Sequence, residues 1–203
     1  MAQLVLLRGA NVGGNIFRPS ELAQQLARWD VVSLGAAGTF VVRAPIERSQ
    51  IESEIRRRLP FEAEMMTLSD RELGALLRID PLQGRPAEEG VRRFAAAASG
   101  PVPTPPPLPA HFPNQAEWQV VLTGVTGKVA YGYRRRFGER LVYPNEALER
   151  LFRIPFTTRW WETLEQAHSK MAGDPVSRRS RPGASGRPGR ARSGRTAPAA
   201  HVE

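Results

Sequence analysis

The order of the predicted strands and helices in the first 68 residues constrains the fold of this 203-residue chain more than any other feature. An apolar run at 2–8 predicts a buried strand, because it is short and a glycine-rich loop follows it. Two β-branched segments, at 31–34 and 39–43, flank a glycine-bounded turn at 35–38 and predict a hairpin. A fourth strand is expected at 62–68.

Two helices are predicted in the intervals between these strands. Pro19 suits the first turn of a helix, where its missing N–H needs no partner, and one face of that helix is apolar at Leu22, Leu26 and Trp29. The second helix is expected to begin at the capping box 49–52, SQIE, and to end at Pro60. Another capping box at 69–72, SDRE, opens a further helix.

The resulting order, β-α-β-β-α-β, is typical of the ferredoxin-like fold, also called the split βαβ or alpha-beta plait. In that fold two helices cover one face of a four-stranded antiparallel sheet. We expect residues 1–80 to form one such unit, completed by a linker helix.

The same pattern returns in a degraded form in residues 81–172. Six prolines between 101 and 109 exclude an ordinary helix, so a proline-rich connection is expected in place of the first helix. Strands are predicted at 91–98, 117–123 and 128–134, the last two around a turn at 124–127, and helices at 145–152 and 161–171, the latter capped by Thr157 or Thr158. The predicted fold class is therefore α+β, with two ferredoxin-like units in tandem.

The positive charge of the chain is concentrated at its C-terminal end. The whole chain carries +9, but residues 173–203 hold seven Arg against Asp174 and Glu203, which leaves only +4 on the rest. This segment lacks aromatic residues and cannot bury enough surface to offset the entropy of ordering. We expect a disordered basic tail, which either contacts nucleic-acid phosphates or serves as a solubilising extension.

Several classes of protein are excluded by composition and motif. The absence of cysteine excludes disulfide scaffolds and thiolate metal sites, and no apolar run reaches the roughly 20 residues of a membrane helix. A soluble, cytoplasmic protein is the expectation, with no metal and no cofactor. No residue stands out as a catalytic nucleophile or base, so the sequence leaves open whether the protein is an enzyme.

Three segments carry a family resemblance: LLRGANVGG at 6–14, GTFVV at 38–42 and PFTTRWWET at 155–163. Together they resemble a bacterial family known as domain of unknown function 1697, over about residues 2–170. The resemblance implies a tandem plait and supplies no activity, substrate or cofactor. This chain departs from the family pattern at Trp160, where an asparagine is usual, and at Thr39, where the hairpin usually has asparagine.

Two sets of residues are candidates for a binding site. The first combines the end of the first strand and the glycine-rich loop with the TTR segment: Arg8, Gly9, Asn11, Gly13, Gly14, Thr158 and Arg159. Guanidinium groups, a hydroxyl and backbone N–H groups suit a carboxylate or phosphate, and the alternative is a structural clasp between the two halves.

The second set is Tyr131, Tyr133, Arg134, Arg135 and Arg136. Aromatic and basic residues on a plait sheet are the way RNA-recognition modules stack bases. The alternative is a sheet face that is buried against the other half, with solvated arginines at its edge. The sequence thus predicts a module that binds a small anion or nucleotide, or alternatively a nucleic-acid-associated protein that uses this face and the tail.

Overall fold

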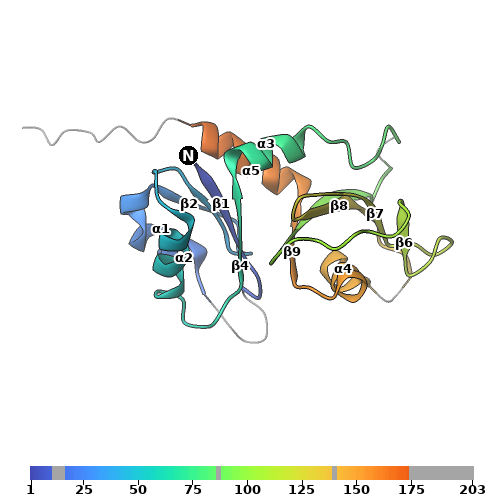
Figure 1. Cartoon of the computed structure of the whole chain (residues 1–203), viewed down its shortest axis with the longest axis horizontal. Helices are drawn as coiled ribbons and strands as arrows, with labels where there is room; N and C mark the ends of the chain where they lie inside the picture. The colour runs from blue at the N-terminus through green and yellow to red at the C-terminus, as the bar shows by residue number, and fades with distance from the viewer. Residues whose placement is uncertain (11–16, 86–87, 139–140, 174–203) are drawn as a thin grey trace, which may run out of the picture.

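The computed structural model describes residues 1–10, 17–85, 88–138 and 141–173; Asn11, Gly13, Gly14 and the predicted tail beyond 173 lie outside the described residues. The described chain is a mixed α+β protein with two antiparallel sheets. Figure 1 shows the two sheets side by side, with helices α3 and α5 lying across both.

The first half contains β1 (Gln3–Leu7), α1 (Pro19–Gln25), a short 3-10 helix (Ala27–Trp29), β2 (Val31–Leu34), β3 (Thr39–Val42), α2 (Arg48–Arg56), β4 (Met65–Ser69) and α3 (Asp70–Leu77). Its strands pair in the order β2-β3-β1-β4, and every pair is antiparallel. Because side chains alternate along a strand, Val5 and Leu7 face α1 and α2, whereas Leu4 and Leu6 face the opposite side.

The second half contains β5 (Arg92–Ala98), β6 (Ala110–Phe112), β7 (Val120–Thr126), β8 (Val129–Arg134), α4 (Pro144–Phe152), β9 (Phe156–Trp160) and α5 (Trp161–Ala172). Its strands pair in the order β6-β7-β8-β5-β9, again all antiparallel. The outer face of this sheet packs against one helix, α4, through Ala147, Leu148 and Phe152. The proline-rich segment contributes Val102 to the same cluster.

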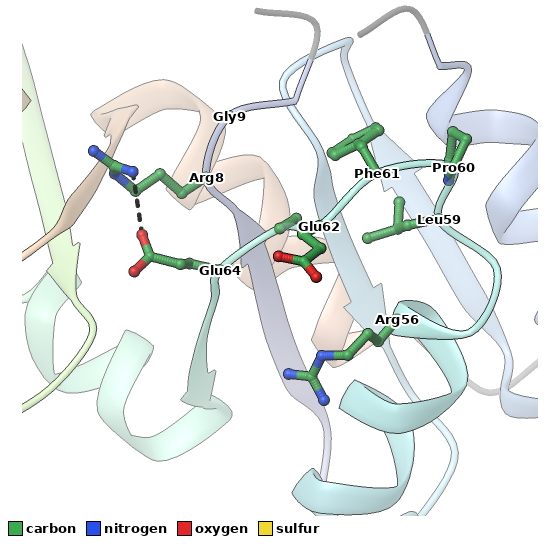
Figure 2. Close-up of a pocket in the computed structure, with 9 residues that line it drawn as sticks. Arg8, Gly9, Arg56, Leu59, Pro60, Phe61, Glu62 and Glu64 are labelled. Atoms are coloured by element: carbon green, nitrogen blue, oxygen red, sulfur yellow. Dashed lines mark hydrogen bonds and ion pairs between the residues drawn. The ribbon is translucent and has the colours of Figure 1, made fainter.

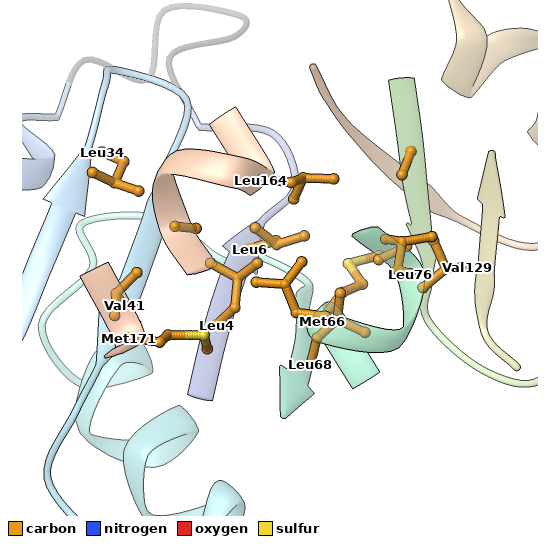
Figure 3. Close-up of a cluster of buried hydrophobic side chains, with 14 of the residues drawn as sticks. Leu4, Leu6, Leu34, Val41, Met66, Leu68, Leu76, Val129, Leu164 and Met171 are labelled. Atoms are coloured by element: carbon orange, nitrogen blue, oxygen red, sulfur yellow. The ribbon is translucent and has the colours of Figure 1, made fainter. Parts of the chain in front are cut away.

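One hydrophobic cluster joins the two halves (Figure 3). It contains Leu4, Leu6 and Met66 from the first sheet, Ala95, Ala97 and Val129 from the second, and side chains of α3 and α5. Helix α5 follows the second sheet in sequence, yet it contacts β2 and β3 as well as β5 and β9. Trp161 at its start is only 1% exposed. The two halves therefore share a core, and the chain end of the second half helps to cover the first sheet.

The two predicted capping boxes have different outcomes. At α3 the prediction is confirmed: the Ser69 hydroxyl accepts the Glu72 N–H, and the Glu72 carboxylate accepts the Ser69 N–H at 2.7 Å. At α2 it is wrong, because the helix begins at Arg48 and its N-cap, Glu47, makes no side-chain cap. The Glu52 carboxylate instead accepts a hydrogen bond of 2.6 Å from the Thr67 hydroxyl, so a tertiary contact replaces the local one.

Three further local predictions need correction. Thr157 and Thr158 lie within β9 and do not cap α5, whose N-cap is Trp160. The strand predicted at 62–68 begins only at Met65. β7 continues through the predicted turn to Thr126, with a register shift between Leu122 and Gly124.

The longest helix of the described segments, α5, has 12 residues. None of the helices in those segments has the length and apolarity needed to cross a membrane.

Candidate functional site

Arg159 is the most buried cation of the predicted anion site, with 7% of its surface exposed. It extends from β9 toward the end of β1 and the β2–β3 turn. Its N–H groups donate to six acceptors: the Thr39 hydroxyl (2.6 Å), the Thr157 hydroxyl (2.9 Å), and the carbonyls of Thr158 (2.8 Å), Leu7 (3.0 Å), Ala37 (2.6 Å) and Gly38 (3.2 Å).

All six of these acceptors are neutral, and four of them belong to the first half of the chain. Burial lowers the pKa of Arg159 to about 10, so the guanidinium keeps its charge at neutral pH. The Thr157 hydroxyl adds a further bond of 3.1 Å to the Leu7 carbonyl. The donors of Arg159 are thus directed at protein groups, and they tie β9 to the first sheet.

Arg8, the second predicted cation, also bridges the halves. Its Nε and Nη2 atoms bind the two carboxylate oxygens of Glu149 at 3.1 and 3.2 Å, in the two-pronged geometry that suits guanidinium and carboxylate. Its Nη1 binds Glu64 at 3.2 Å (Figure 2). Glu149 is itself held by the Phe156 N–H at 3.0 Å. Two carboxylates thus neutralise the single positive charge of Arg8.

A cavity of about 980 Å³ lies beside Arg8 (Figure 2), lined by Arg8, Gly9, Arg56, Leu59, Pro60, Phe61, Glu62, Ala63 and Glu64. Its two arginines are matched by two glutamates, so its lining has no excess of positive charge. Gly9 has a φ of +80°, a conformation that favours glycine. Of the residues expected here from the glycine-rich loop, only Gly9 is among those described.

Thr158 precedes Arg159 on β9, and its carbonyl is one of the six acceptors of Arg159. Its hydroxyl is buried and has no hydrogen-bond partner among the described residues. It lines a cavity of about 200 Å³ together with Arg159, Thr39, the β2–β3 turn, Thr163 and Gln166. Arg8 and Arg159 thus lie at the same junction between the halves but line different cavities, and among the described residues of the predicted set only Thr158 shares a cavity with Arg159.

The two tyrosines of the second predicted set are packed inside the protein. Tyr133 is 3% exposed; its ring packs edge-on against Trp118 at 5.3 Å, and its hydroxyl accepts a 2.8 Å bond from Arg85. Tyr131 packs against the cluster between the two sheets. Tyr131 thus lies toward the other half, as the alternative of a buried sheet face expects, whereas the contacts of Tyr133 are with Arg85 and Trp118 of its own half.

The arginines that follow the tyrosines line an open pocket of about 300 Å³. Its lining is Gly90, Arg92, Arg134, Arg135, Arg136, Leu141 and Trp160, and we call it the arginine–tryptophan pocket. Arg92 stacks over the Trp160 ring at 4.1 Å, and Arg134 lies 5.8 Å from the same ring. Burial, and then the neighbouring charges of Arg92 and Arg136, lower the pKa of Arg134.

Strand register explains why these arginines meet. Arg92 on β5 is the direct antiparallel partner of Arg134 on β8, and Phe94 is the partner of Trp160 on β9. Like charges directly opposite each other in a sheet repel. Among the described residues, the one carboxylate that pairs with this group is Glu162, which lies 3.4 Å from Arg92.

The sequence prediction included Arg134, Arg135 and Arg136 but missed Arg92 and did not count Trp160 among its site residues. Both come from strands distant in sequence, so only the pairing of β5 with β8 and β9 brings them together. Tyr143, 47% exposed, was missed as well; its ring lies 5.4 Å from the Arg134 guanidinium. The one available signal was the departure from the family pattern at Trp160.

Histidines and carboxylates are the side chains of the described residues best suited to bind a metal ion. Within the described ranges, no group of three or more His, Asp or Glu side chains is placed to hold a metal ion. His168 on α5 lies 3.6 Å from Asp70 on α3, and both side chains are more than 40% exposed.

Comparison with known proteins supports the fold alone. No protein-family model matches the chain, and no curated protein matches it. Among solved structures, the chain is similar to a conserved bacterial protein from Streptococcus pneumoniae, with 17% sequence identity and a TM-score of 0.53. The match covers 84% of this chain and 98% of that one, so it extends over both halves.

Proposed function

We propose that the protein is a binding module for a phosphate-bearing small molecule of nucleotide size, held in the arginine–tryptophan pocket. The observation that carries this proposal is the cross-strand pair of Arg92 and Arg134 with Arg136 beside it. Two arginines in direct register repel one another, and a dianionic phosphate between them removes that cost. Guanidinium groups also bind phosphate oxygens in pairs, which gives orientation as well as affinity.

The surroundings favour a ligand with an aromatic part. Trp160 forms one wall of the pocket, and Tyr143 offers an exposed ring next to Arg134. A flat heterocycle stacks on such a ring while its phosphate remains on the arginines. The cavity of about 300 Å³ is at the lower end of the range for small-molecule sites.

The anion site predicted at Arg8, Gly9, Asn11, Gly13, Gly14, Thr158 and Arg159 stays a prediction, and the contacts of its two arginines favour the clasp. Arg8 is held by two carboxylates, and Arg159 donates to six protein acceptors. An anion at either would have to displace bonds that join the two halves.

Titration calorimetry of the full chain with ATP, with adenosine and with inorganic phosphate tests this function. We expect ATP and phosphate to bind and adenosine to bind much more weakly, with ATP the tightest. Arg92→Gln and Arg136→Gln should each weaken ATP binding by about tenfold, the value of one charge-assisted hydrogen bond.

Arg71→Gln is the matched control, because Arg71 is an exposed arginine on α3, outside the pocket. It should leave ATP affinity within about twofold of the wild-type value. An equal loss in all three variants would mean general attraction of anions to a basic protein, and no ATP or phosphate binding at millimolar concentration would refute the proposal.

A second candidate function, association with nucleic acid, is favoured by Arg135. Its guanidinium stacks on Trp118 at 3.9 Å and lies 5.0 Å from Phe137, so the basic and aromatic surface continues beyond the pocket. Residues 173–203 add a net charge of +5. If the tail supplies affinity, truncation at 173 should weaken single-stranded RNA binding and flatten its salt dependence. Unchanged affinity after truncation would eliminate the role of the tail.

We further infer that each half is a ferredoxin-like unit. The order β2-β3-β1-β4 of the first sheet matches the order β7-β8-β5-β9 of the second, and β6 is an added edge strand. In the second half the proline-rich segment replaces the first helix. Membership of the domain of unknown function 1697 family and a bacterial, cytoplasmic origin are proposed on the three sequence segments given above.

A further inference from the structure

A second cavity lies on the outer face of the second half, where this sheet has one covering helix and the first sheet has two. Its volume is about 490 Å³, within the range of small-molecule sites. It lies between the β6–β7 edge and α4, and its lining is Phe112, Pro113, Glu117, Gln119, Phe137, Gly138, Leu141, Val142, Glu146, Ala147 and Arg150. The proline-rich connection thus leaves a space where a helix would otherwise pack.

The walls of this cavity are apolar and held in place. Phe112, Val142 and Ala147 belong to the core cluster under α4 and extend it into the cavity. The Gln119 side chain, 5% exposed, accepts the Val142 N–H at 3.0 Å and fixes that wall. Phe137 is 44% exposed, so an aromatic ring stands open to solvent where a ligand would cover it.

Helix α4 contributes two side chains of opposite charge to the lining of this cavity. Glu146 and Arg150 are four residues apart, so both are on the same side of the helix. Neither side chain makes an ion pair or hydrogen bond with any described residue. Glu117, also exposed, lines the cavity as a second carboxylate. A carboxylate and a guanidinium are therefore both available to one ligand.

We propose that this cavity binds a zwitterion with an apolar side chain, an amino acid or a dipeptide. The ammonium binds the carboxylate of Glu146, the carboxylate binds Arg150, and the apolar side chain packs on Phe112, Val142 and Ala147. A fatty acid would bring its negative charge toward the carboxylates of Glu117 and Glu146, and an alkylamine would leave Arg150 unpaired. The zwitterion satisfies both charges and the apolar wall. This site does not depend on the arginine–tryptophan pocket.

The experiment is titration calorimetry of the full chain with L-phenylalanine, the dipeptide Phe-Leu, and two derivatives of each. The N-acetyl derivative removes the positive charge, and the C-terminal amide removes the negative charge. We expect the amino acid or the dipeptide to bind, the tighter of the two identifying the ligand size, and each derivative to bind at least about tenfold more weakly.

Two variants test which charge of the ligand each side chain binds. Glu146→Gln should weaken zwitterion binding about tenfold and make N-acetylation inconsequential, whereas Arg150→Gln should do the same for amidation. Arg71→Gln is the control and should bind as wild type does. Unchanged melting temperatures establish that both variants are folded, since the two side chains have no partner to lose among the described residues.

Two results would overturn the inference. The first is the absence of heat with both zwitterions at millimolar concentration. The second is equal affinity for zwitterions and their derivatives, which would mean that only the apolar wall is used.

Discussion

Replacement of Arg159 by methionine tests whether the junction between the halves depends on one buried guanidinium. Methionine keeps an unbranched side chain in the same space but has no donor, so all six hydrogen bonds of Arg159 are lost. Two of the carbonyls retain other donors: Leu7 O keeps the Thr157 hydroxyl at 3.1 Å, and Gly38 O keeps the Leu7 N–H at 2.8 Å. Ala37 is exposed, so water can replace the lost donor there.

The main loss is then at Thr39, whose side chain is fully buried and whose hydroxyl has Arg159 as its donor. An unsatisfied buried polar group costs about 1–3 kcal/mol, and the weaker hold between the halves adds about 1 kcal/mol. The substitution also removes a buried charge, which is why the total is far below the sum of six bonds. We expect a loss of about 2–4 kcal/mol, and a melting temperature lower by roughly 5–15 °C.

Thermal and urea unfolding of the wild type, Arg159→Met, Arg159→Lys and Arg71→Met measure this effect. Lysine keeps the charge but has one nitrogen in place of the planar fork, so it should recover less than half of the loss. Arg71→Met removes an exposed arginine and should change the melting temperature by less than about 2 °C.

A melting temperature of Arg159→Met within about 2 °C of the wild type would refute the clasp. If the same variant were stable but lost a phosphate-induced rise in melting temperature that the wild type shows, Arg159 would be a ligand-binding residue. The anion site predicted from the sequence would then be the better interpretation.

Three other substitutions have defined outcomes. Ser69→Ala removes a confirmed capping box and should cost about 1 kcal/mol in urea unfolding, and an unchanged midpoint would contradict this. Gly132→Ala should destabilise the second sheet severely, by about 3 kcal/mol or more, because a Cβ would overlap the Val121 carbonyl of the paired strand; normal expression and melting would contradict it. Burial raises the pKa of Glu54, but its contacts with three arginines outweigh this effect and lower the pKa below its usual value. Its stabilisation is therefore present above the unfolded pKa near 4.5 and is lost as the pH falls, so Glu54→Gln should lower the melting temperature at pH 7 and converge with the wild type near pH 3.

The fold of the first half was predictable because its signals are local. A short continuous apolar run identifies β1, and Pro19 marks the first turn of α1. The capping boxes mark the limit of such signals. Both have the S-x-x-E pattern, but in the box at 49–52 the Glu52 carboxylate accepts a hydrogen bond from Thr67 on a neighbouring strand. The local pattern predicted the capping box correctly at 69–72, where no tertiary hydrogen bond from a described residue competes for the glutamate.

The binding surfaces were only partly predictable, because strand pairing creates them. Arg134 was selected from its neighbours in sequence, but its partner Arg92 lies 42 positions away and meets it only through the β5–β8 register. Tyr133 was selected by the same reasoning, but it is buried against Trp118. This burial was not predictable, because no sequence pattern shows which face of β8 Trp118 covers. The cavity beside α4 lies on the face of the second sheet that one helix covers, and the six prolines at 101–109 excluded a helix in that segment without predicting a cavity.

Arginine is the common cation of this protein: it accounts for all but two of its 29 basic residues, so the presence of an arginine is weak evidence for a site. Its contacts distinguish the roles. Arg8 is matched by carboxylates and Arg159 by buried neutral acceptors, and both arrangements are complete without a ligand. Arg92 and Arg134 instead face each other across paired strands, and among the described residues only Glu162, 3.4 Å from Arg92, offsets their two like charges. A fold that tolerates this repulsion at an open pocket has a physical reason to bind an anion there, and the clasp residues have none.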